Sequence, residues 1–213
     1  LKWQLQKTII SLFRVQKVFY NMIAILKYNA GNSTSVKNAV QKLGYKCIVT
    51  DDAKELLKAD KVIFPGVGEA NSAMQYLTKK GIDKVILNIK KPFLGICLGM
   101  QLMCQKTEEG NTNCLGIFDA NVKLFPKTDI VPHMGWNNFT TVKSELFNNI
   151  KLTDNMYFVH SYFVEQNKNS IADCDYILPF CVAMKKDNFY GTQFHPEKSA
   201  KVGQHILQNF LEL

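Results

Sequence analysis

Short apolar runs alternate with segments whose apolar positions recur every three or four residues, a pattern that predicts buried strands alternating with helices. The expected strands of the first half are Met22–Lys27, Tyr45–Thr50, Lys61–Phe64 and Pro92–Cys97. The expected helices are near Ser35–Leu43, Ala70–Lys80 and Asp83–Lys90, with Gly44 after the first and Gly81 between the other two. This alternation predicts right-handed βαβ units and a mostly parallel sheet with helices on both faces.

The pattern changes after about residue 116, where strand-like segments follow one another without helices between them. These segments are Ala120–Leu124, Asn138–Val142, Tyr157–Val164, Phe180–Lys186 and Phe189–Phe194. They predict an antiparallel extension of the parallel sheet. A last helix is expected at Val202–Leu211, so the fold class is α/β with a single domain over residues 22–213.

The composition is that of an ordinary globular domain, with 46% hydrophobic and 21% charged residues. The six cysteines (47, 97, 104, 114, 174 and 181) form no C-x-x-C pair and no cluster with histidine at zinc spacing, so neither a metal nor a cofactor is expected. No apolar run approaches the ~18 residues of a membrane-spanning helix. A reducing cytoplasm fits the chain, because the chemistry that the motif around Cys97 predicts requires a free thiol.

Half of the formal net charge of +8 comes from residues 1–21, which hold four basic residues and no acid. The rest of the chain has no basic stripe interleaved with aromatic residues, which argues against a nucleic-acid partner. Its modest positive charge would equally suit an acidic protein surface.

The clearest candidate for chemistry is the segment Gly95-Ile96-Cys97-Leu98-Gly99, which lies between a predicted strand and a helical pattern. A G-x-C-x-G at such a turn is a nucleophile elbow, and a helix N-terminus favours the thiolate form of Cys97. A cysteine nucleophile needs a base and an acceptor that orients this base. His195 and Glu197, in Gln193-Phe194-His195-Pro196-Glu197, would supply both if they end one strand and point the same way. The alternative is a buried structural cysteine and a surface His-Pro-Glu.

The loop Pro65-Gly66-Val67-Gly68 follows the strand at Lys61–Phe64, at the sheet edge where α/β proteins bind ligands. Its backbone N–H groups, with that of Leu98, could stabilise a tetrahedral oxyanion. No Gly-Lys-Ser/Thr follows, which excludes a P-loop. An ordinary tight turn is the alternative.

At these residues the chain resembles the class I (triad) glutamine amidotransferases, and in particular the glutaminase subunits of imidazole glycerol phosphate synthase. The matching stretches are Tyr28–Asn32, Pro65–Gly68, Gly95–Leu102, Val131–Asn137, Tyr157–Tyr162 and Gln193–Ser199. The resemblance covers about residues 22–213. It implies a flavodoxin-like fold and a Cys97–His195–Glu197 triad that hydrolyses L-glutamine to glutamate and ammonia.

Further roles follow from the resemblance alone. It assigns the oxyanion hole to Val67 and Leu98, and glutamine binding to Gly66, Gln101, Ser161 and Tyr162. It implies that ammonia passes to a (β/α)8 cyclase subunit in a heterodimer, which makes imidazole glycerol phosphate and an aminoimidazole carboxamide ribotide. The partner interface and ammonia path would include Asn32, Met134, Trp136, Tyr157 and Lys198. Without the resemblance, Gln101 would be expected to be solvated and Tyr162 to lie in the core, and His133 and His160 are expected to be structural.

One stretch departs from the family, because Lys27-Tyr28-Asn29 replaces a run that commonly begins with an acidic or small residue. This loop faces the partner in the family, so a rival hypothesis is a paralogous subunit that supplies ammonia for amidation of a surface sugar. A third hypothesis is a non-catalytic regulatory subunit, against which the intact triad argues.

The resemblance begins only at Met22. Apolar residues at positions 5, 9, 12 and 13 fit one helix face, as in a targeting segment, but one arginine and three lysines make a poor transit peptide. We expect residues 1–21 to be a dispensable extension, with Met22 as the natural start.

Overall fold

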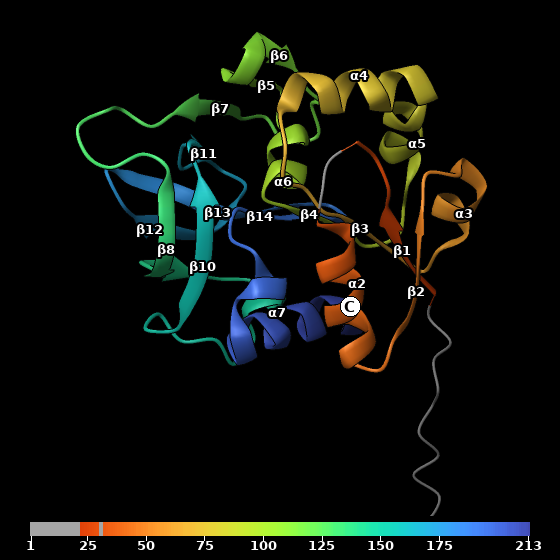
Figure 1. The fold of residues 1–213 in the computed structure, drawn as a ribbon. Helices are drawn as coiled ribbons and strands as arrows, with labels where there is room; N and C mark the ends of the chain where they lie inside the picture. Colours follow the sequence, from red (N-terminus) through yellow and green to blue (C-terminus); the bar gives the residue numbers. More distant parts are fainter. Residues whose placement is uncertain (1–21, 30–31) are drawn as a thin grey trace, which may run out of the picture.

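The computed structural model describes residues 22–29 and 32–213, and a twisted sheet runs through its centre (Figure 1). The core strands are β1 (Met22–Leu26), β2 (Lys46–Thr50), β3 (Lys61–Phe64), β4 (Phe93–Ile96) and β14 (Phe189–Thr192). They lie in the order β2-β1-β3-β4-β14, and all four pairings are parallel. The predicted parallel sheet is therefore confirmed.

The sheet continues beyond β14 with the predicted, mostly antiparallel extension. Its strands are β13 (Pro179–Lys186), β11 (Tyr162–Val164), β7 (Asn121–Leu124) and the short β5 (Lys106–Thr107) and β6 (Thr112–Asn113), which were not predicted; β12 (Ser170–Asp175) pairs with β13 and with β9 (Thr141–Val142). The β5–β7 pair is parallel. A separate two-stranded ribbon is formed by β8 (His133–Asn138) and β10 (Asn155–His160), and it stands beside the main sheet (Figure 1).

Helices cover both faces of the sheet (Figure 1). One face carries α2 (Ser33–Lys42) and α7 (Ala200–Glu212), and the other carries α3 (Ala53–Lys58), α4 (Ala70–Lys80), α5 (Ile82–Asn88) and α6 (Leu98–Leu102). Successive side chains of a strand point to opposite faces. In β1, Ile23 and Ile25 accordingly join the core under α2 and α7, whereas Ala24 and Leu26 join the core on the other side.

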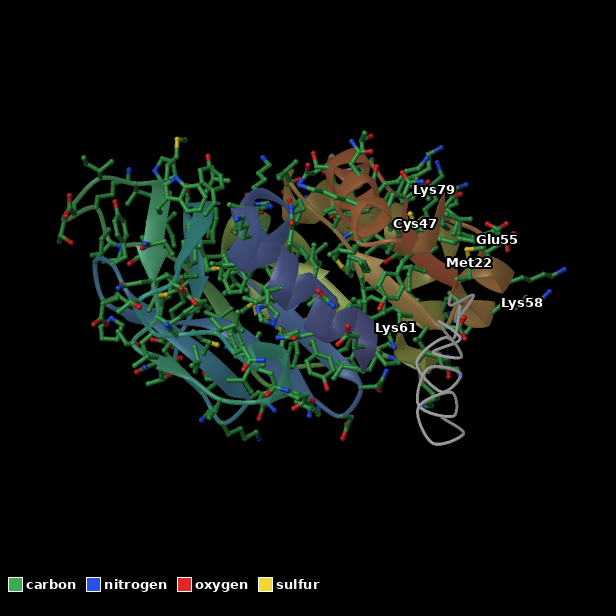
Figure 2. The ribbon with its side chains drawn as sticks, turned by 90° about the horizontal axis from the view of Figure 1, so that it is seen from below. Met22, Cys47, Glu55, Lys58, Lys61 and Lys79 are labelled. Atoms are coloured by element: carbon green, nitrogen blue, oxygen red, sulfur yellow. The ribbon has the colours of Figure 1, made fainter. Side chains whose placement is uncertain are left out.

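Figure 2 looks onto the face that α2 and α7 cover. Met22 and Cys47 lie near each other there, because residues 22–26 of β1 pair with residues 46–50 of β2. Lys58 and Lys79 extend away from the body of the domain, where their ammonium groups are solvated. Lys61, on β3, is by contrast buried and only 5% exposed.

Several element predictions were wrong in detail. The segment Asn138–Val142 is not one strand, since β8 ends at Asn138 and β9 begins at Thr141, and β8, β12 and α3 were missed. The segment Tyr157–Val164 is broken at Ser161 into β10 and β11, which belong to different sheets. The strand predicted at Phe189–Phe194 ends at Thr192. The expected extension at residues 1–21 lies outside the described residues, and among the described helices none is long and apolar enough to span a membrane.

Candidate active site

The elbow forms where β4 passes into α6. Cys97 lies between them with φ 52° and ψ −110°, a strained conformation for a residue with a side chain. The flanking glycines are needed because the turn is tight: a Cβ on Gly99 would collide with the Phe64 carbonyl oxygen. A Cβ on Gly95 would lie 2.7 Å from the Gly99 carbonyl oxygen. The strain projects the Cys97 thiol out of the backbone turn, where 6% of the residue remains exposed.

His195 and Glu197 are brought together by a turn and not by a strand. The 3-10 turn η3 (Pro196–Lys198) follows β14 and brings Glu197 to the Nδ1 side of the His195 ring. The Nδ1 atom of His195 lies 2.8 Å from Oε1 of Glu197, and both side chains are 0% exposed. The predicted strand end was therefore wrong, although the predicted pairing of the two side chains is present.

The electrostatics of His195 favour the imidazolium form. Burial lowers the pKa of His195, but the Cys97 sulfur and the Glu197 carboxylate outweigh burial and raise it to about 10. Nε2 of His195 is buried and has no hydrogen-bond partner. Since Glu197 engages Nδ1, this second nitrogen is the one left to exchange a proton with Cys97 or with a bound molecule.

Asn32 contacts Glu197 from the start of α2. Its side-chain amide donates to Oε1 of Glu197, the same oxygen that pairs with His195. Asn32 has φ 77°, a left-handed conformation that asparagine tolerates better than most residues. The resemblance implied that Asn32 lies at a partner interface, and the structure shows it in contact with the triad carboxylate.

The backbone of His195 is held from both sides by Tyr157 and Ser199. The His195 N–H donates to the Tyr157 carbonyl at 3.0 Å. The Ser199 hydroxyl donates to the His195 carbonyl at 2.6 Å and accepts from the Tyr157 N–H at 2.9 Å. Strand β10 is thereby linked directly to the residue that carries the imidazole.

The Cys97 thiol opens into a cavity of about 300 Å³, a size that suits a small ligand. The lining includes the predicted residues Val67, Leu98, Gln101, Ser161 and Tyr162. Glu109 and His160 also line it, and sequence analysis assigned neither of them to ligand binding. The Glu109 carboxylate accepts the Ala70 N–H at 2.9 Å, and its pKa is raised by burial.

Gln101 is buried, contrary to what its sequence position alone suggests. Its side-chain Nε2 donates to the Tyr162 carbonyl at 3.1 Å and to Oε1 of Gln193 at 2.8 Å. The Gln101 amide therefore lies in the cavity wall with Ser161 and Tyr162, the residues that the resemblance also assigns to glutamine binding.

Gly66 lies under the elbow and accepts a hydrogen bond from it. The Leu98 N–H donates to the Gly66 carbonyl at 3.4 Å. The Gly66 carbonyl and the Val67 N–H belong to one planar trans peptide, so they point in opposite directions. The Val67 N–H is therefore turned away from Leu98, and the two predicted oxyanion donors do not converge in this arrangement.

His133 and His160 form a buried pair between the ribbon and the cavity. Nδ1 of His160 lies 2.8 Å from the Tyr162 carbonyl, and Nε2 of His160 lies 3.0 Å from Nδ1 of His133. The carbonyl can only accept, so each ring must carry its proton on Nδ1. Burial lowers the pKa of His133 to about 4 and that of His160 to about 3. Both rings are therefore neutral near pH 7.

The predicted interface residues other than Asn32 come from the ribbon and from η3. Met134 and Trp136, from β8, are 63% and 56% exposed. The Tyr157 ring packs edge-on against Trp136 at 5.8 Å, and the Lys198 ammonium lies 5.9 Å from the Tyr157 ring. We call Met134, Trp136, Tyr157 and Lys198 the ribbon face.

Among residues 22–29 and 32–213, no three histidine, cysteine, aspartate or glutamate side chains are placed to hold a metal ion. The residues around Cys97 instead have the arrangement of covalent catalysis. A thiol lies beside a buried imidazole, and a carboxylate fixes the ring. Such a group can attack a carbonyl and carry an acyl group as a thioester.

Comparison with known proteins agrees with this chemistry. Residues 24–213 match the family model described as glutamine amidotransferase class-I. The chain is 53% identical to the imidazole glycerol phosphate synthase subunit HisH of Bacteroides fragilis (strain YCH46), over 90% of this chain and 99% of that protein. It is 44% identical to the protein of the same name from Pasteurella multocida (strain Pm70), over 89% and 97%.

Solved structures share the fold at low sequence identity. A putative GMP synthase subunit from Thermoplasma acidophilum superposes with a TM-score of 0.69 at 22% identity, covering 90% of this chain and 92% of that one. PurLQS from Thermotoga maritima gives a TM-score of 0.66 at 13% identity, covering 91% and 99%.

Proposed function

Since this chain belongs to the class I glutamine amidotransferases, we propose that it is the glutaminase subunit of an imidazole glycerol phosphate synthase. It hydrolyses L-glutamine to glutamate and ammonia, with Cys97, His195 and Glu197 as catalytic residues. The observation that carries this assignment is the buried His195–Glu197 pair beside a Cys97 thiol that opens into a cavity of about 300 Å³.

Catalysis begins with attack of the Cys97 thiolate on the side-chain amide carbon of glutamine. His195 gives its proton to the departing ammonia as the C–N bond breaks, which leaves a γ-glutamyl thioester. Water then attacks the thioester and gives a proton to His195, and the C–S bond breaks to release glutamate. Glu197 keeps the ring in one tautomer throughout.

The cavity lining supplies groups for the amino-acid end of glutamine. The Glu109 carboxylate is the acidic side chain of the lining, and it suits the α-ammonium group. Gln101 and the backbone of Ser161 and Tyr162 lie on the same wall. Glutamine bound in this way would present its side-chain amide to Cys97.

Oxyanion stabilisation requires a change in the loop Pro65–Gly68. Rotation of the peptide between Gly66 and Val67 would release the Leu98 N–H from the Gly66 carbonyl and turn the Val67 N–H toward the cavity. Two donors would then meet a developing oxyanion. We propose that partner docking at the ribbon face favours this rotated form, so that ammonia is released only when an acceptor is present.

The partner that we propose is the (β/α)8 cyclase subunit, bound as a heterodimer and supplied with ammonia for imidazole glycerol phosphate and aminoimidazole carboxamide ribotide. The names of the relatives support histidine biosynthesis over amidation of a surface sugar. We place the protein in the cytoplasm because a catalytic Cys97 must stay reduced, and the six cysteines are all free.

The test is Cys97→Ala in complex with the histidine-pathway cyclase. We expect loss of glutamine-dependent synthesis by ~10³-fold or more, because the nucleophile is absent, and unchanged synthesis with ammonium salts. Near-normal glutamine turnover by the variant would refute the triad. Stimulation of the wild type by a sugar amidotransferase synthase, and not by the cyclase, would support the rival partner.

A further inference from the structure

Gln193 is fully buried next to the nucleophile. It follows β14, and its backbone N–H donates to the Val182 carbonyl at 2.8 Å, which fixes the start of the side chain. Its side-chain Nε2 lies 3.5 Å from the Cys97 sulfur, within hydrogen-bond range for sulfur. The amide therefore touches the atom that forms and breaks the covalent bond.

The direction of this amide is set by a chain of neighbours. The Tyr162 carbonyl can only accept, so the group of Gln101 beside it must be the NH₂. The second hydrogen of this NH₂ faces Gln193 at 2.8 Å, so Gln193 must present its oxygen there. The NH₂ of Gln193 is then left to face the Cys97 sulfur. Reversing Gln193 would set two NH₂ groups against each other and remove the donor from the sulfur.

We propose that Gln193 is a further catalytic residue, whose amide N–H donates to the Cys97 sulfur and stabilises its thiolate. This inference rests on the proposed function of Cys97 as nucleophile. A hydrogen bond to an ionised acceptor is stronger than one to a neutral acceptor, so the donor stabilises the thiolate more than the thiol. It also keeps the sulfur in one position for attack.

An uncharged donor is useful because His195 cannot act as hydrogen-bond donor to the sulfur in both steps. His195 gives its proton to ammonia in the first step and takes a proton from water in the second. The sulfur leaves the thioester with the electron pair of the C–S bond in that second step. The amide of Gln193 does not titrate, and it can donate to the departing sulfur while His195 is occupied with water.

The network also connects the sulfur to the substrate wall. Gln101 lines the cavity and donates a hydrogen bond to the side-chain oxygen of Gln193. A ligand that hydrogen-bonds to Gln101 therefore affects the Gln193 amide, which donates to the Cys97 sulfur. Gln101 is thus a positioning residue for Gln193, in addition to its place in the wall.

The test compares Gln193→Met, which keeps the length of the side chain but has no N–H donor, with the wild type and with the surface change Gln208→Met. The first readout is the pH dependence of Cys97 alkylation by iodoacetamide in the full chain, located by mass spectrometry. We expect roughly tenfold slower alkylation of Cys97 at neutral pH in Gln193→Met, because the hydrogen-bond donor to the thiolate is lost. The second readout is glutamine turnover in the cyclase complex, where kcat should fall roughly tenfold with little change in KM.

Gln208 is exposed and contacts Glu212, so Gln208→Met should match the wild type in both readouts. If Gln193→Met does not fold, as judged by circular dichroism and melting, Gln193→Glu preserves the shape and the acceptor for Gln101. It should also slow alkylation. A wild-type alkylation profile and wild-type kcat in a folded Gln193 variant would overturn the inference. Failure of the proposed function would be distinct, because Cys97→Ala would then keep its glutamine turnover.

Discussion

The side-chain amide of Asn32 donates to the Glu197 oxygen that also pairs with His195. The other carboxylate oxygen of Glu197 is buried and has no partner. Orientation of His195 thus depends on two residues that are far apart in the sequence. A change at Asn32 should therefore affect catalysis more than substrate binding.

Asn32→Ala should lower kcat for glutamine about fivefold, which corresponds to the loss of one hydrogen bond of about 1 kcal/mol, and leave KM nearly unchanged. Glu197→Gln should have a larger effect, because it removes the charge that stabilises the imidazolium. Steady-state kinetics of the cyclase complex would measure both. A rise in KM with an unchanged kcat in Asn32→Ala would assign Asn32 to the cavity and not to the triad.

Glu109→Gln should raise KM for glutamine roughly tenfold or more, since a substrate ammonium would lose its half-buried carboxylate partner. The neighbouring change Glu108→Gln is the matched control, because Glu108 is exposed and accepts from the Leu124 N–H, away from the cavity. Steady-state kinetics with glutamine would measure KM for both variants. Equal KM values for the two variants would show that Glu109 does not contact the substrate.

Gly68→Ala should reduce the stimulation of glutaminase by the cyclase, by roughly tenfold, because φ is 150° at Gly68 and a Cβ restricts the rotation of the loop. Gly81→Ala is a suitable control, since Gly81 also has positive φ (69°) but lies between α4 and α5. The measurement is the ratio of glutamine hydrolysis with and without the cyclase. Full stimulation of Gly68→Ala would argue against a peptide rotation.

Stability should fall in mild acid because of His133 and His160. Their folded pKa values, about 4 and about 3, lie below the ordinary value of 6.5, so the unfolded chain binds protons that the folded chain does not. The free energy of unfolding should therefore decrease as pH falls from about 6.5 toward 4, by up to ~1.4 kcal/mol per pH unit for each ring.

The contribution of His195 to the free energy of unfolding has the opposite pH dependence. Its pKa is raised to about 10, so its contribution to stability is complete below about pH 6.5 and is lost as pH rises toward 10.

Urea unfolding at pH 7, 5.5 and 4.5 would measure the loss of stability in acid that His133 and His160 cause. The variant His133→Gln should lose less stability over this range. Equal stability at pH 7 and pH 4.5 would contradict the neutral pair.

Deletion of residues 1–21 should leave glutaminase activity and melting temperature unchanged. The family match begins at residue 24, and relatives that align over 99% of their length use 90% of this chain. Differential scanning calorimetry and glutamine turnover with the cyclase would test this. A drop of several degrees or loss of cyclase binding would show that the segment belongs to the working protein.

Much of the fold was predictable, because the parallel core consists of apolar strands such as Ile23–Leu26 that are buried on both faces. The misses have local causes. Helix α3 has only six residues and depends on the Asp52 side chain as its cap. Strand β12 contains two aspartates, and it forms a strand because β13 pairs with it. Strand β12 is thus specified by a tertiary partner that its own segment does not reveal.

The triad was easier to predict than its surroundings. The elbow at Cys97 is specified locally, by the five consecutive residues 95–99. In contrast, the contact of Asn32 with Glu197 joins positions 165 residues apart, and that of Gln193 with Cys97 joins positions 96 apart. Gln193 stands beside the His-Pro-Glu motif, but the direction of its amide depends on Gln101 and the Tyr162 carbonyl. Only the folded chain brings these groups together.

The backbone carbonyl of Tyr157 accepts a hydrogen bond from the His195 N–H, whereas the Tyr157 ring lies on the ribbon face. Replacing the exposed side chains of the ribbon would therefore leave both hydrogen bonds of the Tyr157 backbone available. The surface that selects a synthase can diverge through mutation while the imidazole stays in position. New pairs of glutaminase and synthase could thus arise in evolution, or be engineered, by exchanging ribbon sequences without redesigning the catalytic centre.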